Sequence, residues 1–236
     1  MRRLHFIKPP AGWSDFFTEL VIVVVGVFVA LGAQEAVNNW NAKRELGDFR
    51  SAVDREVAEN LAAYERRVQQ SSCVNARLDQ LEAWQSDWRD GSGPMMLGRI
   101  RRPIGYTLGQ DVWASGLAEN LREMPLEQRL NYAGLYAGFQ TYDNLRLREA
   151  AVWQSLYAYD QATSLTPPEV NTLRGLILSA RSLGWSIDGN WPELKQQAAA
   201  MGIAPNPYTL EPVAKRVCAA IAFSGAVRPT SQPENR

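Results

Sequence analysis

One apolar stretch stands out in the sequence: Leu20-Val21-Ile22-Val23-Val24-Val25-Gly26-Val27-Phe28-Val29-Ala30-Leu31-Gly32-Ala33. It contains no charged residue, and no other segment of the chain is as apolar. A helix needs about 20 residues to cross the hydrocarbon core of a bilayer, so this run alone is short. Apolar residues on both sides, Trp13 and Val37 among them, extend it to a full span. We therefore predict a membrane anchor over residues 14–40.

The anchor combines bulky apolar side chains with small ones and has an aromatic residue at each flank. Trp13 and Trp40 lie where interfacial aromatic residues are common. Gly26 and Ala30 form a small-xxx-small pair, which permits close approach of a second helix. The residues expected to make the anchor are Leu20, Val24, Gly26, Phe28, Ala30, Leu31 and Trp40.

Two other interpretations of the stretch stay open. Ala30-Leu31-Gly32 has the small-x-small form of a signal-peptide cleavage site, although Asp15 and Glu19 are unusual upstream of one. The stretch could also be a buried helix of a soluble protein.

The orientation of the anchor is inferred from charge. Arg2, Arg3 and Lys8 precede the span, and three basic residues also follow it closely, so counting them gives a tie. The upstream tail is free of acidic residues as far as Asp15. We expect the N-terminus in the cytoplasm of a bacterial cell and the C-terminal domain in the periplasm.

The rest of the chain has the patterning of helices. From Leu46 to Val68 apolar residues recur every three or four positions, which is typical of one buried helix face. Charged residues, including Glu56, are expected on the other sides, and the helix is expected to continue to a breaker at 90–94. No segment shows the alternation of a strand. The fold class is therefore predicted as all-α: the anchor continues into a long amphipathic helix, which packs in an antiparallel helical bundle.

Further helices are expected beyond an irregular segment, 94–109. They cover 112–122, 125–159, a helix from a capping box at Thr166 to about Leu183, 192–201 and 210–223. Glycines at 184 and 189 leave the continuity between 183 and 192 open. We predict a short tail (1–13), the anchor (14–40), a helical extramembrane domain (41–227) and a disordered tail (228–236).

The anchor also carries a resemblance. Val23-Val24-Val25-Gly26-Val27-Phe28-Val29-Ala30-Leu31, followed by Asn39-Trp40-Asn41, resembles an uncharacterised bacterial family of single-span membrane proteins with α-helical extramembrane domains. The similarity is sharpest over residues 15–65. It implies the topology and carries no catalytic residue.

The two cysteines, Cys73 and Cys218, allow two interpretations. In an oxidising compartment they would form a disulfide that closes a long loop. Otherwise they would be two small buried apolar residues.

Most catalytic motifs are absent from the sequence. His5, the only histidine, precedes the anchor, so the domain has no Ser-His-Asp triad and no histidine-based metal site. There is no CxxC, no P-loop and no Gly-x-Gly-x-x-Gly. We expect no catalytic, cofactor or metal site, and no cofactor.

Three groups of residues have both an ordinary and a functional interpretation. The acids Asp111, Glu119, Glu149 and Asp188 are expected on solvated faces or beside local arginines, with carboxylate catalysis as the alternative. The aromatic set Tyr132, Tyr136, Tyr142, Trp153 and Tyr157 is expected in the core, with a ligand pocket as the alternative. The loop arginines Arg99, Arg101 and Arg102 are expected in solvent, with contact to anionic lipid or an acidic partner as the alternative.

The formal net charge is zero, which gives no indication of nucleic-acid binding. The leading hypothesis is a non-enzymatic protein, held in the lipid bilayer, whose helical domain binds another membrane protein or a second copy of itself. The alternatives are a sensory ligand-binding bundle acting through a signalling partner, and a carboxylate-dependent hydrolase of envelope polymers.

Overall fold

The computed structural model describes residues 12–88, 93–116, 123–209 and 214–225. Within these ranges the secondary structure is helical, with no strand longer than an isolated bridge. The prediction of an all-α fold with helices packed against each other is confirmed. The chain divides into two compact units, Met1–Arg50 and Ser51–Arg236.

The described part of the first unit is the N-terminal portion of helix α1, which runs from Trp13 to Val68. From Phe16 to Asn41 every side chain of the helix is exposed. Phe28, for example, is 70% exposed and Ile22 is 65% exposed. An apolar helix of this length meets the requirement for a membrane span, and none of its most apolar window is buried.

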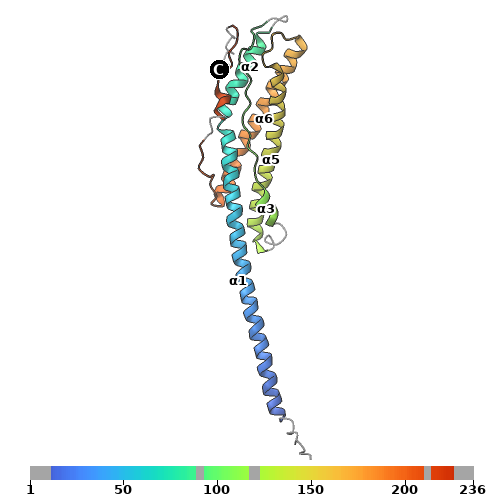
Figure 1. The fold of residues 1–236 in the computed structure, drawn as a ribbon, viewed down its shortest axis with the longest axis vertical. Helices are drawn as coiled ribbons and strands as arrows, with labels where there is room; N and C mark the ends of the chain where they lie inside the picture. The colour runs from blue at the N-terminus through green and yellow to red at the C-terminus, as the bar shows by residue number, and fades with distance from the viewer. Residues whose placement is uncertain (1–11, 89–92, 117–122, 210–213, 226–236) are drawn as a thin grey trace, which may run out of the picture. The chain divides into compact units, whose positions relative to one another are not determined.

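The second unit is an antiparallel bundle (Figure 1). It contains the end of α1, α2 (Ser71–Ser86), α3 (Asp111–Gly116), α5 (Leu126–Leu156) with the 3-10 turn η1 (Tyr157–Tyr159), α6 (Pro167–Ala200) and the 3-10 turn η2 (Ala214–Cys218). In Figure 1, α2 and α5 run in one direction and α6 returns in the other. The apolar stripe predicted on α1 faces the core, where Val53, Val57 and Leu61 are fully buried.

An irregular segment, residues 93–110, lies along the helices and is here called the strap. Buried or half-buried polar side chains of the helices hold it in place. Asn60 Nδ2 donates to the carbonyl of Gly109 at 2.7 Å, and the amide of Gly109 donates back to Asn60 Oδ1 at 2.8 Å. Gln70 forms the same kind of reciprocal pair with Ile104, at 3.0 and 2.9 Å. These bonds satisfy backbone groups that have no partner in a helix or sheet.

The long helix predicted from the anchor to residue 90 is interrupted. α1 ends at Val68, and α2 begins at Ser71. The side chain of Gln70 binds the carbonyl of Arg66 and both backbone groups of Ile104. The interruption therefore places the buried side-chain amide of Gln70 next to the backbone of Ile104 in the strap. The predicted breaker at 90–94 lies mostly outside the described residues.

α6 is longer than predicted. It continues through Gly184, Gly189 and Pro192 to Ala200 as one helix. Proline removes one backbone donor from a helix. The buried face nevertheless continues through Ile187, Trp191 and Leu194. Packing of this face against the bundle outweighs the weak helix propensity of the glycines and the proline. The capping box at its start is present, with Thr166 and Glu169 hydrogen-bonded to each other.

The predicted helix over 210–223 is wrong in its described part. Residues 214–218 form only the 3-10 turn η2, and the chain beyond it pairs with the strap. Met96 and Phe223 form an isolated antiparallel bridge, and the amide of Leu97 donates to the carbonyl of Ala222 at 2.8 Å. These long-range backbone bonds replace the local bonds that a helix would make. The helix predicted over 112–122 is described only as α3.

Candidate functional site

The predicted anchor residues all lie on the exposed part of α1. Leu20, Val24, Phe28 and Leu31 are 42–70% exposed, and Trp40 is 63% exposed. Gly26 has no heavy atom within 4 Å of an added Cβ, so this small residue is not used for packing inside the chain. The guanidinium of Arg44 lies 6.0 Å from the ring centroid of Trp40. A cation beside an indole at the end of an apolar helix is an arrangement that suits a membrane interface.

Cys73 and Cys218 are joined by a disulfide, with Cα atoms 4.6 Å apart and 145 residues of sequence separation. It links α2 to η2. Two hydrogen bonds support the link: Arg77 Nη2 donates to the carbonyl of Val217 at 3.3 Å, and the amide of Ile221 donates to Gln80 at 3.2 Å. Together they hold the described C-terminal segment against α2.

Arg99, Arg101 and Arg102 lie on the strap with exposed side chains. They bring positive charge close to a buried arginine of α2. Burial of Arg77, together with the charge of Arg101, lowers the pKa of the Arg77 guanidinium. The strap therefore adds cations to a region that already contains one.

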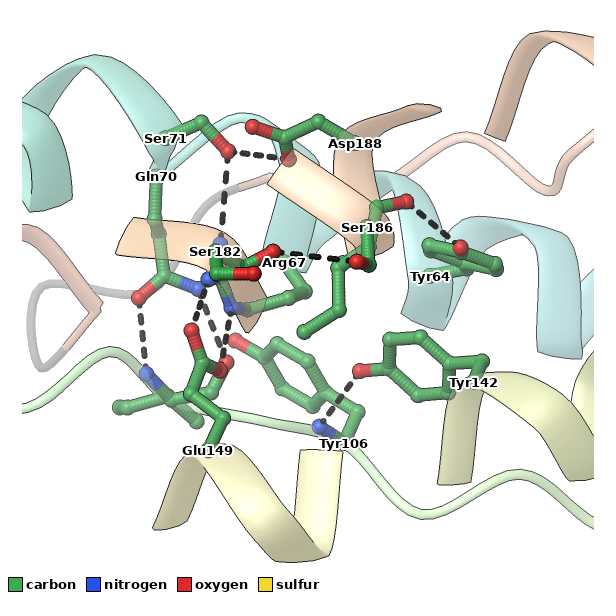
Figure 2. A network of polar contacts seen from close by, with 12 residues as sticks. Tyr64, Arg67, Gln70, Ser71, Tyr106, Tyr142, Glu149, Ser182, Ser186 and Asp188 are labelled. Atoms are coloured by element: carbon green, nitrogen blue, oxygen red, sulfur yellow. Dashed lines mark hydrogen bonds and ion pairs between the residues drawn. The ribbon is translucent and has the colours of Figure 1, made fainter. Parts of the chain in front are cut away.

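A network of polar side chains occupies the middle of the bundle (Figure 2). Arg67 of α1 donates through Nε and Nη2 to the two carboxylate oxygens of Glu149 on α5. Both side chains are almost fully buried, at 0% and 3% exposure. Burial alone would lower the pKa of Arg67, but the hydrogen bonds and charge of Glu149 raise it overall. The guanidinium of Arg67 therefore stays charged, and its two hydrogen bonds to Glu149 fix its orientation.

The network extends to α6 through Ser71 (Figure 2). Arg67 Nη1 donates to Ser71 Oγ at 3.4 Å, and Ser71 Oγ donates to Asp188 Oδ1 at 2.5 Å. Burial raises the pKa of the Asp188 carboxyl, and the bond from Ser71 and the charge of Arg67 only partly offset this effect. Of the four predicted acids, Glu149 and Asp188 thus meet around Arg67 instead of lying on solvated faces. Asp111 is exposed at the start of α3, and Glu119 lies outside the described residues.

Two buried tyrosines, Tyr64 and Tyr142, lie at one side of the network. Tyr64 Oη donates to the carbonyl of Ile187 at 2.7 Å, and the amide of Tyr106 donates to Tyr142 Oη at 3.3 Å. The rings of Tyr64 and Tyr142 lie 4.2 Å apart. Burial raises the pKa of Tyr142 to about 12 and raises the pKa of Tyr64 further. Both hydroxyls therefore stay protonated and serve as hydrogen-bonding groups.

A second set of polar contacts was not expected from the sequence. Glu56 was assigned to the solvated side of its helix, but its carboxylate accepts from the amides of Val112 and Trp113 at 3.0 and 3.3 Å and from Tyr136 Oη. A carboxylate at the first amides of α3 satisfies donors that a helix start leaves open. The spacing of Glu56, Asn60 and Tyr64 by four residues is the only sequence signal for this polar edge of the stripe.

The aromatic set is mostly in the core. Tyr132, Tyr136, Tyr142 and Trp153 are buried, and Tyr157 is half-buried. A hollow of about 210 Å³ lies between α5, α6 and α1, lined by Tyr64, Gly134, Gly138, Thr141, Asn190, Glu193, Leu194 and Gln197. Its walls are closely packed, because a Cβ on Gly138 would collide with the side chain of Leu194.

The chemistry available to these groups is limited. Glu149 is held by Arg67, Asp188 accepts from Ser71, and the tyrosine hydroxyls are protonated. Within the described ranges, no group of three or more His, Cys, Asp or Glu residues is placed to hold a metal ion. We interpret the network as structural: its hydrogen bonds and its ion pair hold α1, α2, α5, α6 and the strap together.

Comparison of the chain with protein-family models, with curated proteins and with solved structures gives no match. The resemblance of the anchor to a bacterial single-span family therefore stays a prediction.

Proposed function

We propose that the chain is a single-span membrane protein whose helical domain lies outside the cytoplasm and binds another membrane protein without catalysing a reaction. The observation that carries the proposal is the exposed apolar segment of α1. Large apolar side chains from Phe16 to Val37 are exposed along the helix, yet burying each one would contribute about 1.5–3 kcal/mol. A lipid bilayer is the solvent that would bury all of them at once.

The disulfide supports the location of the domain. Disulfides persist in oxidising compartments and are rare in the bacterial cytoplasm. Cys73 is half-buried and Cys218 is exposed, so the bond would be accessible to cytoplasmic reductants. A periplasmic position of residues 51–236 is compatible with its survival, and it agrees with a cytoplasmic N-terminus.

An exposed apolar patch on α6 supports the proposal that the domain binds another protein. Leu178 is 53% exposed and Trp185, seven residues further on the same helix face, is 65% exposed. Leu178 lines a hollow of about 400 Å³ with Arg148, Val152, Ser179, Ser182 and Leu183. An exposed tryptophan with a second exposed apolar side chain on the same helix face is a common feature of protein-binding surfaces. We call Leu178 and Trp185 the α6 patch.

We propose a protein without catalytic activity because Glu149 and Asp188 already accept hydrogen bonds within the fold. The fold brings Glu149 and Asp188 to the surroundings of Arg67, and both accept hydrogen bonds from neighbouring side chains. The domain has no histidine to act as a general base near neutral pH.

Topology can be tested with reporters fused after Arg236. Alkaline phosphatase is active only in the periplasm, whereas green fluorescent protein fluoresces after folding in the cytoplasm. We expect a strong phosphatase signal, a weak fluorescence signal, and retention of the chain in membranes after washing with alkaline carbonate. Release of the intact chain into the supernatant would contradict the anchor, and the reverse reporter pattern would contradict the orientation.

Partner binding can be tested at natural abundance in the native host. After mild detergent extraction, we expect the chain to migrate on native gels in a complex larger than the single chain. The double variant Leu178→Ser/Trp185→Ser should migrate as the single chain, whereas Leu130→Ser, which changes an equally exposed leucine of α5, should keep the complex. Migration of the unmodified protein as a lone monomer would contradict the proposal.

A further inference from the structure

A second, smaller hollow lies between the strap and α5 in the Ser51–Arg236 unit. It has a volume of about 100 Å³. Its lining comes from four consecutive strap residues and from one face of α5: Arg102, Pro103, Ile104, Gly105, Arg146, Glu149, Ala150 and Trp153. The α5 residues are spaced by three, four and seven positions, so they form a continuous strip along the helix. We call this hollow the strap pocket.

The lining of the strap pocket includes a hydrogen-bond donor that has no acceptor among the described residues. Trp153 is fully buried, at 0% exposure. Its indole Nε1 has no hydrogen-bond partner among the residues that the structure describes. An indole nitrogen can only donate, and a buried donor left without an acceptor costs about 1–3 kcal/mol. A ligand with an acceptor oxygen would remove this penalty.

Arg146 supplies further donors at the side of the pocket. Its Nε donates to Asp143 at 2.9 Å, and the two Nη groups are its other donors. Gly105 of the strap fits against the aliphatic stem of this arginine, because a Cβ there would collide with Arg146 Cγ and Cδ. The strap therefore fixes the position of the guanidinium beside the hollow.

The charge of the pocket is positive. Glu149 is the only acid among the lining residues, and both of its oxygens accept from Arg67. Arg102 adds a cation from the strap. The neighbouring Arg101 is close enough to Arg77 for its charge to lower the pKa of that guanidinium. The remaining polar side chains of the lining are thus donors or cations.

We propose that the strap pocket binds a single phosphate group, with Arg102, Arg146 and Trp153 donating to its oxygens. Three donors from separate positions suit an oxyanion with several acceptor atoms, and arginines bind phosphate well. A volume of about 100 Å³ is several times the roughly 10–15 Å³ that a cavity needs to hold one water molecule, and it accommodates a phosphate group. The phosphate could belong to a soluble phosphate compound or to a lipid headgroup. The inference does not depend on the proposed partner or on the orientation in the membrane.

The test uses the full chain in a non-ionic detergent and a phosphate-free buffer. Thermal unfolding is followed while inorganic phosphate replaces chloride at constant ionic strength. With phosphate at ten times its dissociation constant, we expect the midpoint to rise by about 3–6 °C, and chloride alone should produce no rise. The absence of a rise with phosphate in detergent and also in the lipid experiment below would overturn the proposal.

Variants locate the effect in the pocket. Arg102→Gln and Arg146→Gln should each weaken phosphate binding at least tenfold, and Trp153→Phe, which removes only the indole donor and part of the ring, should weaken it as well. Arg174→Gln changes an exposed arginine of α6 outside the pocket and should keep the full effect. Each shift is measured relative to the same variant without phosphate, so a change in basal stability does not obscure it. Equal shifts in wild type, Arg102→Gln and Arg146→Gln would overturn the proposal.

A second experiment separates the two sources of phosphate. The chain is reconstituted in phosphatidylcholine vesicles with and without phosphatidic acid, and thermal unfolding is compared. A rise that inorganic phosphate produces in detergent supports a soluble ligand. A rise that requires phosphatidic acid and is lost in Arg146→Gln supports a lipid headgroup.

Discussion

Arg67 of α1 and Glu149 of α5, 82 residues apart in the sequence, form a two-pronged ion pair that is almost completely excluded from solvent. A buried ion pair contributes little net stability relative to apolar residues of the same size, because both charges must be desolvated. Removal of only one partner is strongly destabilising, because the remaining buried charge then lacks a partner. We therefore expect this pair to select which helices pack together more than to stabilise the fold.

Replacing one partner should be strongly destabilising. We expect Glu149→Gln to lower the free energy of unfolding by about 3–5 kcal/mol, because Arg67 is then buried without a carboxylate. Urea unfolding of the detergent-solubilised chain, followed by tryptophan fluorescence, measures the change.

Two variants serve as controls for this experiment. Arg67→Met/Glu149→Leu removes both charges and should be more stable than Glu149→Gln. Arg181→Gln removes the bonds of Arg181 to Asp79 and Glu82, whose side chains are 54% and 48% exposed, and should change the free energy of unfolding by less than about 1 kcal/mol. If Glu149→Gln changed the free energy of unfolding no more than Arg181→Gln does, the Arg67–Glu149 pair would not be excluded from water as the structure indicates.

Reduction of the disulfide should loosen the C-terminal segment. In the chain-entropy model, a cross-link that spans 145 residues stabilises the folded state by about 5 kcal/mol. We expect Cys73→Ser/Cys218→Ser to unfold at a lower temperature than wild type under oxidising conditions, with faster proteolysis in the segment after α6. Dithiothreitol should bring wild type to the behaviour of the variant and leave the variant unchanged. A reductant effect of equal size on both proteins would have another origin.

The helical patterning was sufficient to predict the fold class. The stripe containing Val53, Val57 and Leu61 is buried as expected. Helix α5 begins one residue after its predicted start and ends three residues before its predicted end. These elements are regular and amphipathic, so local sequence and tertiary packing favour the same structure. The interruption near Gln70 and the non-helical end near Cys218 depend on contacts with distant segments, which periodicity does not report.

The polar network was harder to predict for the same reason. Glu149 and Asp188 were recognised as acids of uncertain role, but their common neighbour Arg67 was not among the candidate residues. An arginine inside a helix with many charges has no distinguishing sequence signal. Its burial follows from the side chains that α5 and α6 bring to it, and these pairings span 82 residues between Arg67 and Glu149 and 117 between Ser71 and Asp188.

The close contact between α5 and α6 depends on Gly138. A Cβ at this position would collide with the side chain of Leu194. We expect Gly138→Ala to lower the free energy of unfolding by about 1–3 kcal/mol, because leucine must shift or the helices must separate. Urea unfolding again measures the effect.

Gly175 provides the matched control for this substitution. It lies in α6, and a Cβ there would meet no heavy atom within 4 Å. Because alanine favours helices more than glycine does, Gly175→Ala should raise the free energy of unfolding by about 0.5–1 kcal/mol. Stabilisation of similar size by both substitutions would mean that the two helices do not approach as closely as the structure indicates.

Stability should also depend on the ionisation of Asp188. Burial raises the pKa of this carboxyl above its ordinary value of 3.8. The folded state therefore takes up the proton at a higher pH than the unfolded state does. As pH falls through the folded-state pKa toward 3.8, the contribution of Asp188 to the free energy of unfolding should rise, and as pH increases through this range it should be lost.

Asp188→Asn isolates this contribution. Asparagine keeps an acceptor for the hydroxyl of Ser71 but carries no charge. We expect the variant to be more stable than wild type at pH 7 and the difference to shrink as pH approaches about 4, in urea titrations at matched ionic strength. Glu59→Gln, at an exposed position of α1, should change stability little at either pH. If Asp188→Asn were less stable than wild type at pH 7, the attraction between Asp188 and Arg67 would outweigh the desolvation of the carboxylate.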